Sequence, residues 1–207
     1  MLPLGAVTRT FLLLLLAVAT SAGLTDSGSA TLPPENEVLI AQSPLEVADF
    51  ELTDQEARPF KLSDLRGRTT LVFFGFTHCP DICPTTLYKL KLSEESRDRF
   101  LPRATVVMVS VDGDRDTPAA LKSFLTTFSP DFIGLTGNPR TVRDIAARFS
   151  AVFFKGLPED KSGDYLVQHT TQIYLLDKSG RLRATFYDAA TVKTIVDVVR
   201  GVLAEEI

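Results

Sequence analysis

The chain contains two cysteines, Cys79 and Cys83, which stand four positions apart. Each is followed by a proline, and the pair lies where an apolar run ends and a helical pattern begins. Two thiols at this spacing can form a disulfide, act as a redox pair or bind one soft metal ion. The chemistry of this loop therefore depends on what else the fold brings to it.

The spacing of the cysteines separates these three alternatives only in part. A structural disulfide across so short a loop removes little entropy from the unfolded chain, so it is the weakest of them. A CxxC pair at a strand-to-helix junction is usually a redox motif, but here the spacing is CxxxC. A Cu(I) or Zn(II) site would need a third ligand, and imidazole suits both ions. The redox pair and the metal site both remain open on spacing alone.

The elements that must position the cysteines alternate between strands and helices. Continuous apolar runs at 70–76 and 105–111 predict two strands covered on both faces. Thr117-Pro118 and Asn138-Pro139 each place a capping residue before a proline, as at the start of a helix. We also expect a leading hairpin at 47–52 and 58–62, a helix at 84–100, a second hairpin at 173–177 and 182–187, and a closing helix at 191–203.

This order of elements predicts the fold class and the location of the site. It describes a thioredoxin-like (peroxiredoxin-like) α/β sandwich, with a central mixed sheet flanked by helices and an N-terminal β-hairpin. The cysteines follow the first central strand, at the sheet edge where open α/β folds place their sites. With Pro84 as the first helical residue, Cys83 lies at or next to the N-cap, where the helix dipole favours a thiolate.

The two histidines of the chain differ in their relation to this loop. His169 precedes the strand predicted at 173–177, and in a thioredoxin-like fold the chain entering that strand passes beside the cysteines. Thioredoxin-type oxidoreductases usually have a proline there, whereas Thr171 stands near that position in this chain. This favours a metal site of Cys79, Cys83 and His169. Adjacent residues cannot easily both point at one ion, so we expect His78 to support the site and not to ligate.

The N-terminal segment predicts export. Arg9 is followed by a nine-residue apolar run at 11–19 and by small residues, which is typical of a signal peptide. We therefore expect a signal peptide or signal anchor at 1–23, a flexible tether at 24–43 and the folded domain at 44–207, in the periplasm of a bacterium or anchored to a membrane facing it. A net charge of −4 without basic runs argues against nucleic acid or anionic lipid as a partner.

Three motifs of this chain resemble those of the SCO/SenC family of copper-binding assembly proteins, over about residues 45–203. The segment 74–84, FGFTHCPDICP, resembles the first family motif without departure. The segment 109–118, VSVDGDRDTP, resembles the second, with Gly113 where the family usually has proline. The segment 167–170, VQHT, resembles the third, with Gln168 where aspartate is common.

The resemblance implies a copper site and a cellular role. The family's copper ligands correspond to Cys79, Cys83 and His169, and its members help to assemble the binuclear copper centre of cytochrome c oxidase. The implied partners are the copper-bearing oxidase subunit, an exported thiol reductant and an upstream copper donor. Gln168 would take away a negative charge beside the site. Asp112 is expected at the rim of the site, and Asp116 is expected to serve helix-start electrostatics.

The sequence thus predicts a copper metallochaperone, which is not an enzyme, with the copper ion as its cargo. The alternative is an enzyme, a thiol–disulfide reductase that acts on exported proteins through Cys79 and Cys83. A peroxidase would need a nucleophilic cysteine near arginine and threonine, whereas proline, aspartate and threonine surround Cys79. A purely structural module would leave the second and third motifs without a role.

Overall fold

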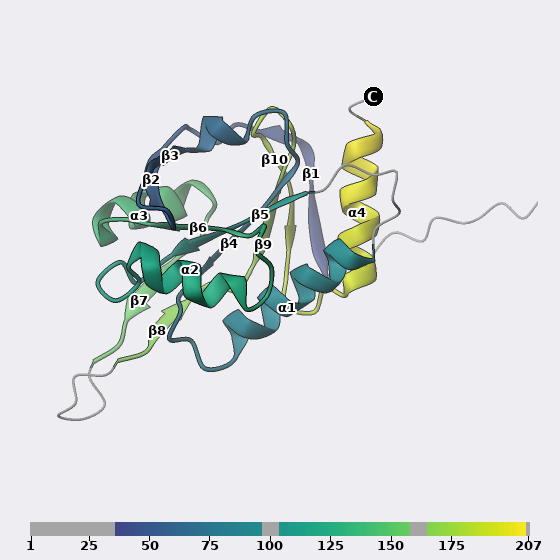
Figure 1. Ribbon diagram of the computed structural model, residues 1–207. Coiled ribbons are helices and arrows are strands. Elements are labelled where there is room, and N and C mark those ends of the chain that lie inside the picture. Colours follow the sequence, from purple (N-terminus) through teal and green to yellow (C-terminus); the bar gives the residue numbers. More distant parts are fainter. Residues whose placement is uncertain (1–35, 97–103, 158–164, 206–207) are drawn as a thin grey trace, which may run out of the picture. The chain divides into compact units, whose positions relative to one another are not determined.

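A mixed β-sheet forms the centre of the fold. The computed structural model describes residues 36–96, 104–157 and 165–205. Within these ranges eight strands follow the order β1-β10-β9-β4-β5-β6-β2-β3, and β7 and β8 form a separate antiparallel pair (Figure 1). The segment predicted as a signal peptide at 1–23 lies outside the described residues, as does most of the predicted tether.

The elements alternate along the chain much as the pattern predicts. The strands are β1 (Val38–Leu45), β2 (Glu51–Asp54), β3 (Pro59–Lys61), β4 (Thr70–Gly75), β5 (Thr105–Ser110), β6 (Ile133–Thr136), β7 (Phe153–Lys155), β8 (Val167–His169), β9 (Ile173–Leu176) and β10 (Leu182–Phe186). The helices are η1 (Leu62–Leu65), α1 (Ile82–Glu95), α2 (Pro118–Thr126), α3 (Pro139–Arg148) and α4 (Val192–Ala204).

The strand that leads to the cysteines, β4, lies in the middle of the sheet. It pairs in parallel with β5 and antiparallel with β9, and all six of its residues are buried. Its neighbours β9 and β5 are similarly buried, which explains why these segments read as continuous apolar runs. The predicted central strands and the hairpin of β9 and β10 are confirmed.

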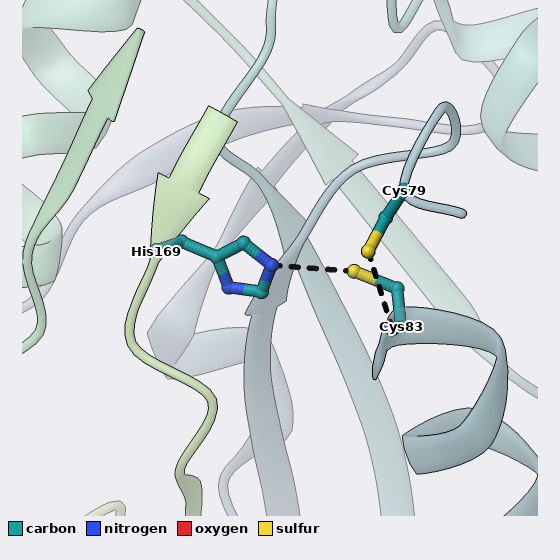
Figure 2. Close-up of side chains that lie close together, drawn as sticks. All are labelled: Cys79, Cys83 and His169. Atoms are coloured by element: carbon teal, nitrogen blue, oxygen red, sulfur yellow. Dashed lines mark hydrogen bonds between the residues drawn. The ribbon is translucent and has the colours of Figure 1, made fainter. Parts of the chain in front are cut away.

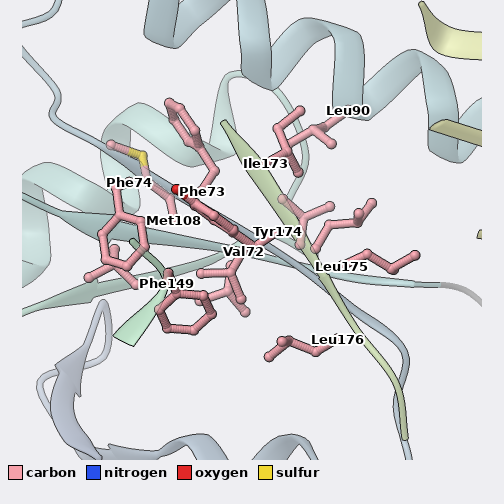
Figure 3. Packing of buried hydrophobic residues seen from close by; sticks show 14 of the residues in the cluster. Val72, Phe73, Phe74, Leu90, Met108, Phe149, Ile173, Tyr174, Leu175 and Leu176 are labelled. Atoms are coloured by element: carbon pink, nitrogen blue, oxygen red, sulfur yellow. The ribbon is translucent and has the colours of Figure 1, made fainter. Parts of the chain in front are cut away.

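Alternate side chains of β4 face two different helix layers. Leu71 lines a small cavity together with Leu90 of α1 and Ile195 of α4, so these helices cover that face of the sheet. Phe74 points to the other face, where its ring packs edge-to-face on Phe149, just after α3, at 5.4 Å (Figure 3). The sheet is therefore covered on both faces, as expected for the thioredoxin-like class.

The start signals of two helices work as the sequence predicts, and the structure adds a third cap of the same kind. The Thr117 hydroxyl accepts a hydrogen bond from the Ala120 amide, and the Asn138 side chain accepts one from the Arg140 amide. Thr191 caps α4 in the same way, by accepting from Thr194. Each cap satisfies a main-chain donor that the helix itself leaves unpaired.

The structure differs from the sequence prediction at three places. Residues 38–43, predicted as part of the tether, belong to the edge strand β1, whose mostly exposed side chains give no alternation of burial. The short strands β6, β7 and β8 were also missed, since three or four residues carry too little pattern. Helix α1 begins at Ile82, two residues before Pro84, and the end predicted for it at residue 100 lies outside the described residues.

No helix within the described residues is both long and apolar enough to cross a membrane.

The core around β4 gives a first testable prediction. Phe74 is 1% exposed and contacts the rings of Phe149 and Tyr174, so Phe74→Ala should lower the free energy of unfolding by about 3–5 kcal/mol. Phe154 is 65% exposed, so Phe154→Ala should change the free energy of unfolding by less than about 0.5 kcal/mol. Urea denaturation followed by circular dichroism measures both values. Equal losses in the two variants would contradict this assignment of the core.

Candidate metal centre

The cysteine loop leaves β4 at a glycine that must remain small. A Cβ atom on Gly75 would lie 2.6 Å from the Phe73 ring, closer than real Cβ contacts, and 3.0 Å from Cys83 Sγ, which is very tight. Any side chain at this position would therefore push on the Phe73 ring and crowd the sulfur atom. The motif glycine at the end of the strand lets the first turn of α1 approach the sheet.

The fold brings three sequence-predicted residues together. Cys79 lies in the loop, Cys83 in the first turn of α1, and His169 at the end of β8 (Figure 2). One ligand atom from each, two sulfurs and an imidazole nitrogen, lie within 4.8 Å of one another. Cys83 Sγ is 3.4 Å from His169 Nε2, and the Cys83 amide donates to Cys79 Sγ at 3.4 Å. Neither cysteine is in a disulfide.

The imidazole of His169 is held in the orientation that a ligand needs. Its Nδ1 is 2.9 Å from the carbonyl oxygen of Thr170, which can only accept, so Nδ1 carries the proton and donates. Nε2 is then left with a lone pair that faces Cys83. Burial lowers the pKa of His169, so the ring stays neutral at neutral pH. The rings of Phe73 and Phe76 pack edge-on to it, with centroids 6.2 and 5.7 Å away.

The environment of Cys83 differs from the sequence prediction. Asp81, not Cys83, is the N-cap of α1, and the Cys83 side chain is fully buried. Burial is the main reason that the pKa of this thiol is raised well above its ordinary value, with smaller contributions from Cys79 and Asp116. The expected gain from the helix dipole is therefore outweighed by desolvation. Without a bound cation, Cys83 is a thiol whose proton can be donated to His169 Nε2.

A buried carboxylate holds the loop ahead of the cysteines. Asp116 is 0% exposed and accepts hydrogen bonds from the Thr77 amide at 3.0 Å, the Thr77 hydroxyl at 2.6 Å and the Ser110 hydroxyl at 2.7 Å. It therefore ties the cysteine loop to the end of β5. This role differs from the helix-start electrostatics expected for Asp116. Asp116 and Thr77 lie 39 residues apart, and no local pattern in the sequence indicates that they form a hydrogen bond.

His78 lies beside the three-residue group, not in it. Its side chain is 51% exposed, and its Nδ1 is 3.0 Å from the Thr77 hydroxyl and 3.7 Å from Asp116. It forms a second group of ligand-type side chains with Asp112 and Asp116. The carboxylates of that group are already used, because Asp112 accepts from Tyr165 and Arg115, and Asp116 from Thr77 and Ser110.

Two departures from the usual motifs have structural explanations. Gln168 pairs with Phe154 across the β7–β8 pair, whereas His169 pairs with Phe153, so the two side chains lie on opposite faces. An aspartate in the place of Gln168 would thus point its charge away from the sulfur atoms. Gln168 was expected to lie beside the site, but its side chain is on the other face of the strand from His169. At Gly113, an added Cβ would lie 2.1 Å from the Gly137 carbonyl oxygen, so the usual proline does not fit this loop.

The difference in burial between the cysteines gives a second prediction. Cys79 is partly exposed, whereas Cys83 is buried with a raised pKa, so iodoacetamide should alkylate Cys83 much more slowly in the reduced, folded protein. Each unit of raised pKa lowers the thiolate fraction about tenfold, so we expect a difference of at least that size at pH 8. Peptide mass spectrometry gives the two rates. In urea the rates should converge, and faster reaction at Cys83 in the folded state would refute the assigned environment.

Comparisons with known proteins identify the family. The SCO1/SenC family model matches residues 40–204. A SCO2-like protein of Rickettsia conorii is 37% identical over 153 residues, which cover 74% of this chain and 75% of that protein. The copper-bound structures of Arabidopsis thaliana ScoI (30% identity, TM-score 0.70, 77% of this chain and 98% of that one) and Bradyrhizobium japonicum ScoI (34%, 0.68, 75% and 98%) share the fold. This chain, with its thioredoxin-like sheet and its Cys-Cys-His group, belongs to the SCO1/SenC family.

Proposed function

We propose that the protein is a copper metallochaperone that binds copper through Cys79, Cys83 and His169 and assists assembly of the copper centre of cytochrome c oxidase. The observation that carries this proposal is the grouping of two sulfurs and one imidazole nitrogen within 4.8 Å of one another. The SCO family is associated with oxidase assembly, and solved relatives hold copper.

The set of ligands favours copper over other ions. Thiolate sulfur and imidazole nitrogen are soft to borderline donors, which suit Cu(I) and Zn(II) and not Mg(II) or Ca(II). Structural zinc sites almost always use four protein ligands, whereas the group contains three. A three-ligand site suits Cu(I) and leaves one side open to an incoming donor atom. With an added oxygen or nitrogen ligand, the same residues suit Cu(II).

The unequal exposure of the ligands suggests how copper leaves. Cys83 is fully buried, whereas Cys79 and His169 are both partly exposed. A thiolate of an acceptor protein would therefore reach the copper ion from the side of Cys79 and His169, and Cys83 would be the last ligand to leave. Ligand exchange changes no oxidation state when the ion is Cu(I), so the transfer needs no further reactant. Uptake requires both cysteines in the reduced form, because thiolates are the ligands.

The proposal includes partners and a location. Loading needs an upstream copper donor and an exported thiol reductant that keeps Cys79 and Cys83 reduced. Delivery needs the copper-bearing subunit of the oxidase. The apolar segment at 11–19 supports export to the periplasm of a bacterium, either as a free protein or anchored through residues 1–23.

The two histidines allow a matched test of the ligand set. His169→Ala removes a ligand, and because loss of an outer-sphere partner alone usually costs about 10–100-fold in metal affinity, the Cu(I) affinity should fall at least about tenfold. His78→Ala removes the other imidazole and should leave the affinity within about a factor of three of the wild-type value. Competition of the reduced proteins with a chromophoric Cu(I) chelator measures both. The ligand assignment fails if His169→Ala binds as the wild type does.

The rival function, a thiol–disulfide reductase, rests on the same free cysteine pair. A reductase needs one accessible thiolate, which the partly exposed Cys79 could supply, and a second thiol that then closes the disulfide. That second thiol would be Cys83, which is buried with a raised pKa and lies against His169, so this step should be slow. We therefore expect insulin reduction by the wild-type protein to be no faster than by the same concentration of a simple dithiol. Turnover well above that level, and unaffected by His169→Ala, would favour the reductase.

A further inference from the structure

The strand that carries His169 is tied to the body of the protein by a set of contacts that the ligand group does not use. Tyr165 lies just before β8, four residues ahead of His169. Its hydroxyl donates to Asp112 Oδ1 at 2.6 Å, and Asp112 lies in the loop that follows β5. This hydrogen bond joins the segment that leads into β8 to the second sequence motif, whose Asp116 already holds the cysteine loop.

The acceptor of this hydrogen bond is itself fixed. Asp112 is 3% exposed, its Oδ2 accepts from Arg115 Nε at 2.5 Å, and its amide donates to the Ser110 hydroxyl. Because one carboxylate oxygen is committed to Arg115, the other is held in place for Tyr165. A charged acceptor also makes the hydrogen bond stronger than one between neutral groups.

Two cations pack on the ring of Tyr165. The Arg115 guanidinium lies 3.7 Å and the Lys155 ammonium 3.9 Å from its centroid. Lys155, on β7, also forms an ion pair with Asp114 at 3.1 Å, so both strands of the pair are connected to the same loop. Burial and the Asp112 carboxylate raise the pKa of Tyr165, so its hydroxyl remains protonated and able to donate at physiological pH.

The same arginine reaches the imidazole through one aromatic ring. Arg115 lies 5.9 Å from the Phe76 centroid, and Phe76 packs edge-on to His169 at 5.7 Å. At the other end of β8, the Thr170 amide donates to the Val152 carbonyl oxygen at 2.9 Å. Between the anchors Tyr165 and Thr170, strand β8 has only three residues, Val167–His169. Because the span is so short, a shift at Tyr165 should also move His169.

We propose that Tyr165, through its hydrogen bond to Asp112, is a positioning residue that holds His169 within reach of the two cysteines. The inference rests on the proposed copper site and adds a device that sets the third ligand. When the latch formed by Tyr165, Asp112 and Arg115 is closed, His169 Nε2 faces Cys83. When it is open, the exposed Lys155–Asp114 ion pair is left of the contacts named above, His169 is no longer held beside Cys83, and the site becomes a two-sulfur site.

The test removes one oxygen atom. Tyr165→Phe keeps the ring on which Arg115 and Lys155 pack and deletes the hydroxyl that binds Asp112. We expect the Cu(I) affinity to fall by about fivefold to tenfold, because only part of what a hydrogen bond to a charged group contributes to the fold would be lost from copper binding. The Cu(II) form should show a shifted thiolate-to-copper absorption band. Tyr187→Phe, at a tyrosine that lines the groove along β1 and β10, is the matched control and should leave both unchanged.

A second background tells positioning from a general loss of structure. In the His169→Ala protein, Tyr165→Phe should have no further effect on Cu(I) affinity, because the residue it positions is absent. An equal loss in both backgrounds, or wild-type affinity and spectrum in Tyr165→Phe, would overturn the inference. If Tyr165→Phe does not fold, Asp112→Asn keeps an acceptor oxygen for Tyr165 but removes its charge, so it should weaken Cu(I) binding about twofold to threefold. Wild-type affinity in that variant would then refute the latch.

The outcomes also distinguish this inference from the proposed function. If His169→Ala leaves copper binding unchanged, the ligand set itself is wrong. If His169→Ala weakens binding and Tyr165→Phe does not, the copper site stands and only the positioning role of Tyr165 falls.

Discussion

The contact between Cys83 Sγ and His169 Nε2, at 3.4 Å, is the interaction on which the proposed chemistry depends. It joins residues 86 positions apart in the sequence, so it forms only when the fold brings α1 and β8 together. The first turn of α1 approaches because residue 75 is a glycine, and β8 approaches because the β7–β8 pair packs its inner face on the body. Cys83 is fully buried and His169 partly so, which places the contact at the margin of the core.

Burial has opposite consequences for the protein without copper and with it. The same desolvation raises the pKa of Cys83 and lowers that of His169, so both groups favour their neutral forms. A thiol and a neutral imidazole can share one proton, which satisfies both groups without a buried charge. A cation that replaces this proton restores neutrality to the thiolate. The neutral pair leaves no buried charge, and its sulfur and imidazole nitrogen suit an ion that prefers soft ligands.

The second motif, at 109–118, has a structural role in this arrangement that its residue types do not reveal. Asp116 fixes the loop before the cysteines through Thr77, and Asp112 fixes the strand of the histidine through Tyr165. Two carboxylates four residues apart thus hold the two halves of the ligand set from one side. Such a division explains why a segment without a metal ligand belongs to the same group of motifs.

Much of the alternation of strands and helices along the chain, two of the helix caps and the three candidate ligands follow from the sequence alone. Continuous apolar runs, capping residues before prolines and the rarity of cysteine and histidine are local signals, and they need no knowledge of distant contacts. Sequence patterns did not predict two kinds of strand, because such segments carry little periodicity. These are strands of three or four residues, as in β6, β7 and β8, and a strand with mostly exposed side chains, as in β1.

The pKa of a thiol, the face on which a side chain lies and the partner of a buried carboxylate all depend on tertiary contacts. The pKa of Cys83 depends on its burial beneath the sheet edge, which outweighs the helix dipole that the sequence suggests. The side of the strand on which Gln168 lies depends on its register with Phe154, and a shift of one residue would reverse it. The partner of Asp112 is Tyr165, 53 residues away, and the partner of Asp116 is Thr77, 39 residues away. Desolvation, register and long-range pairing are properties of the folded chain, so no local pattern encodes them.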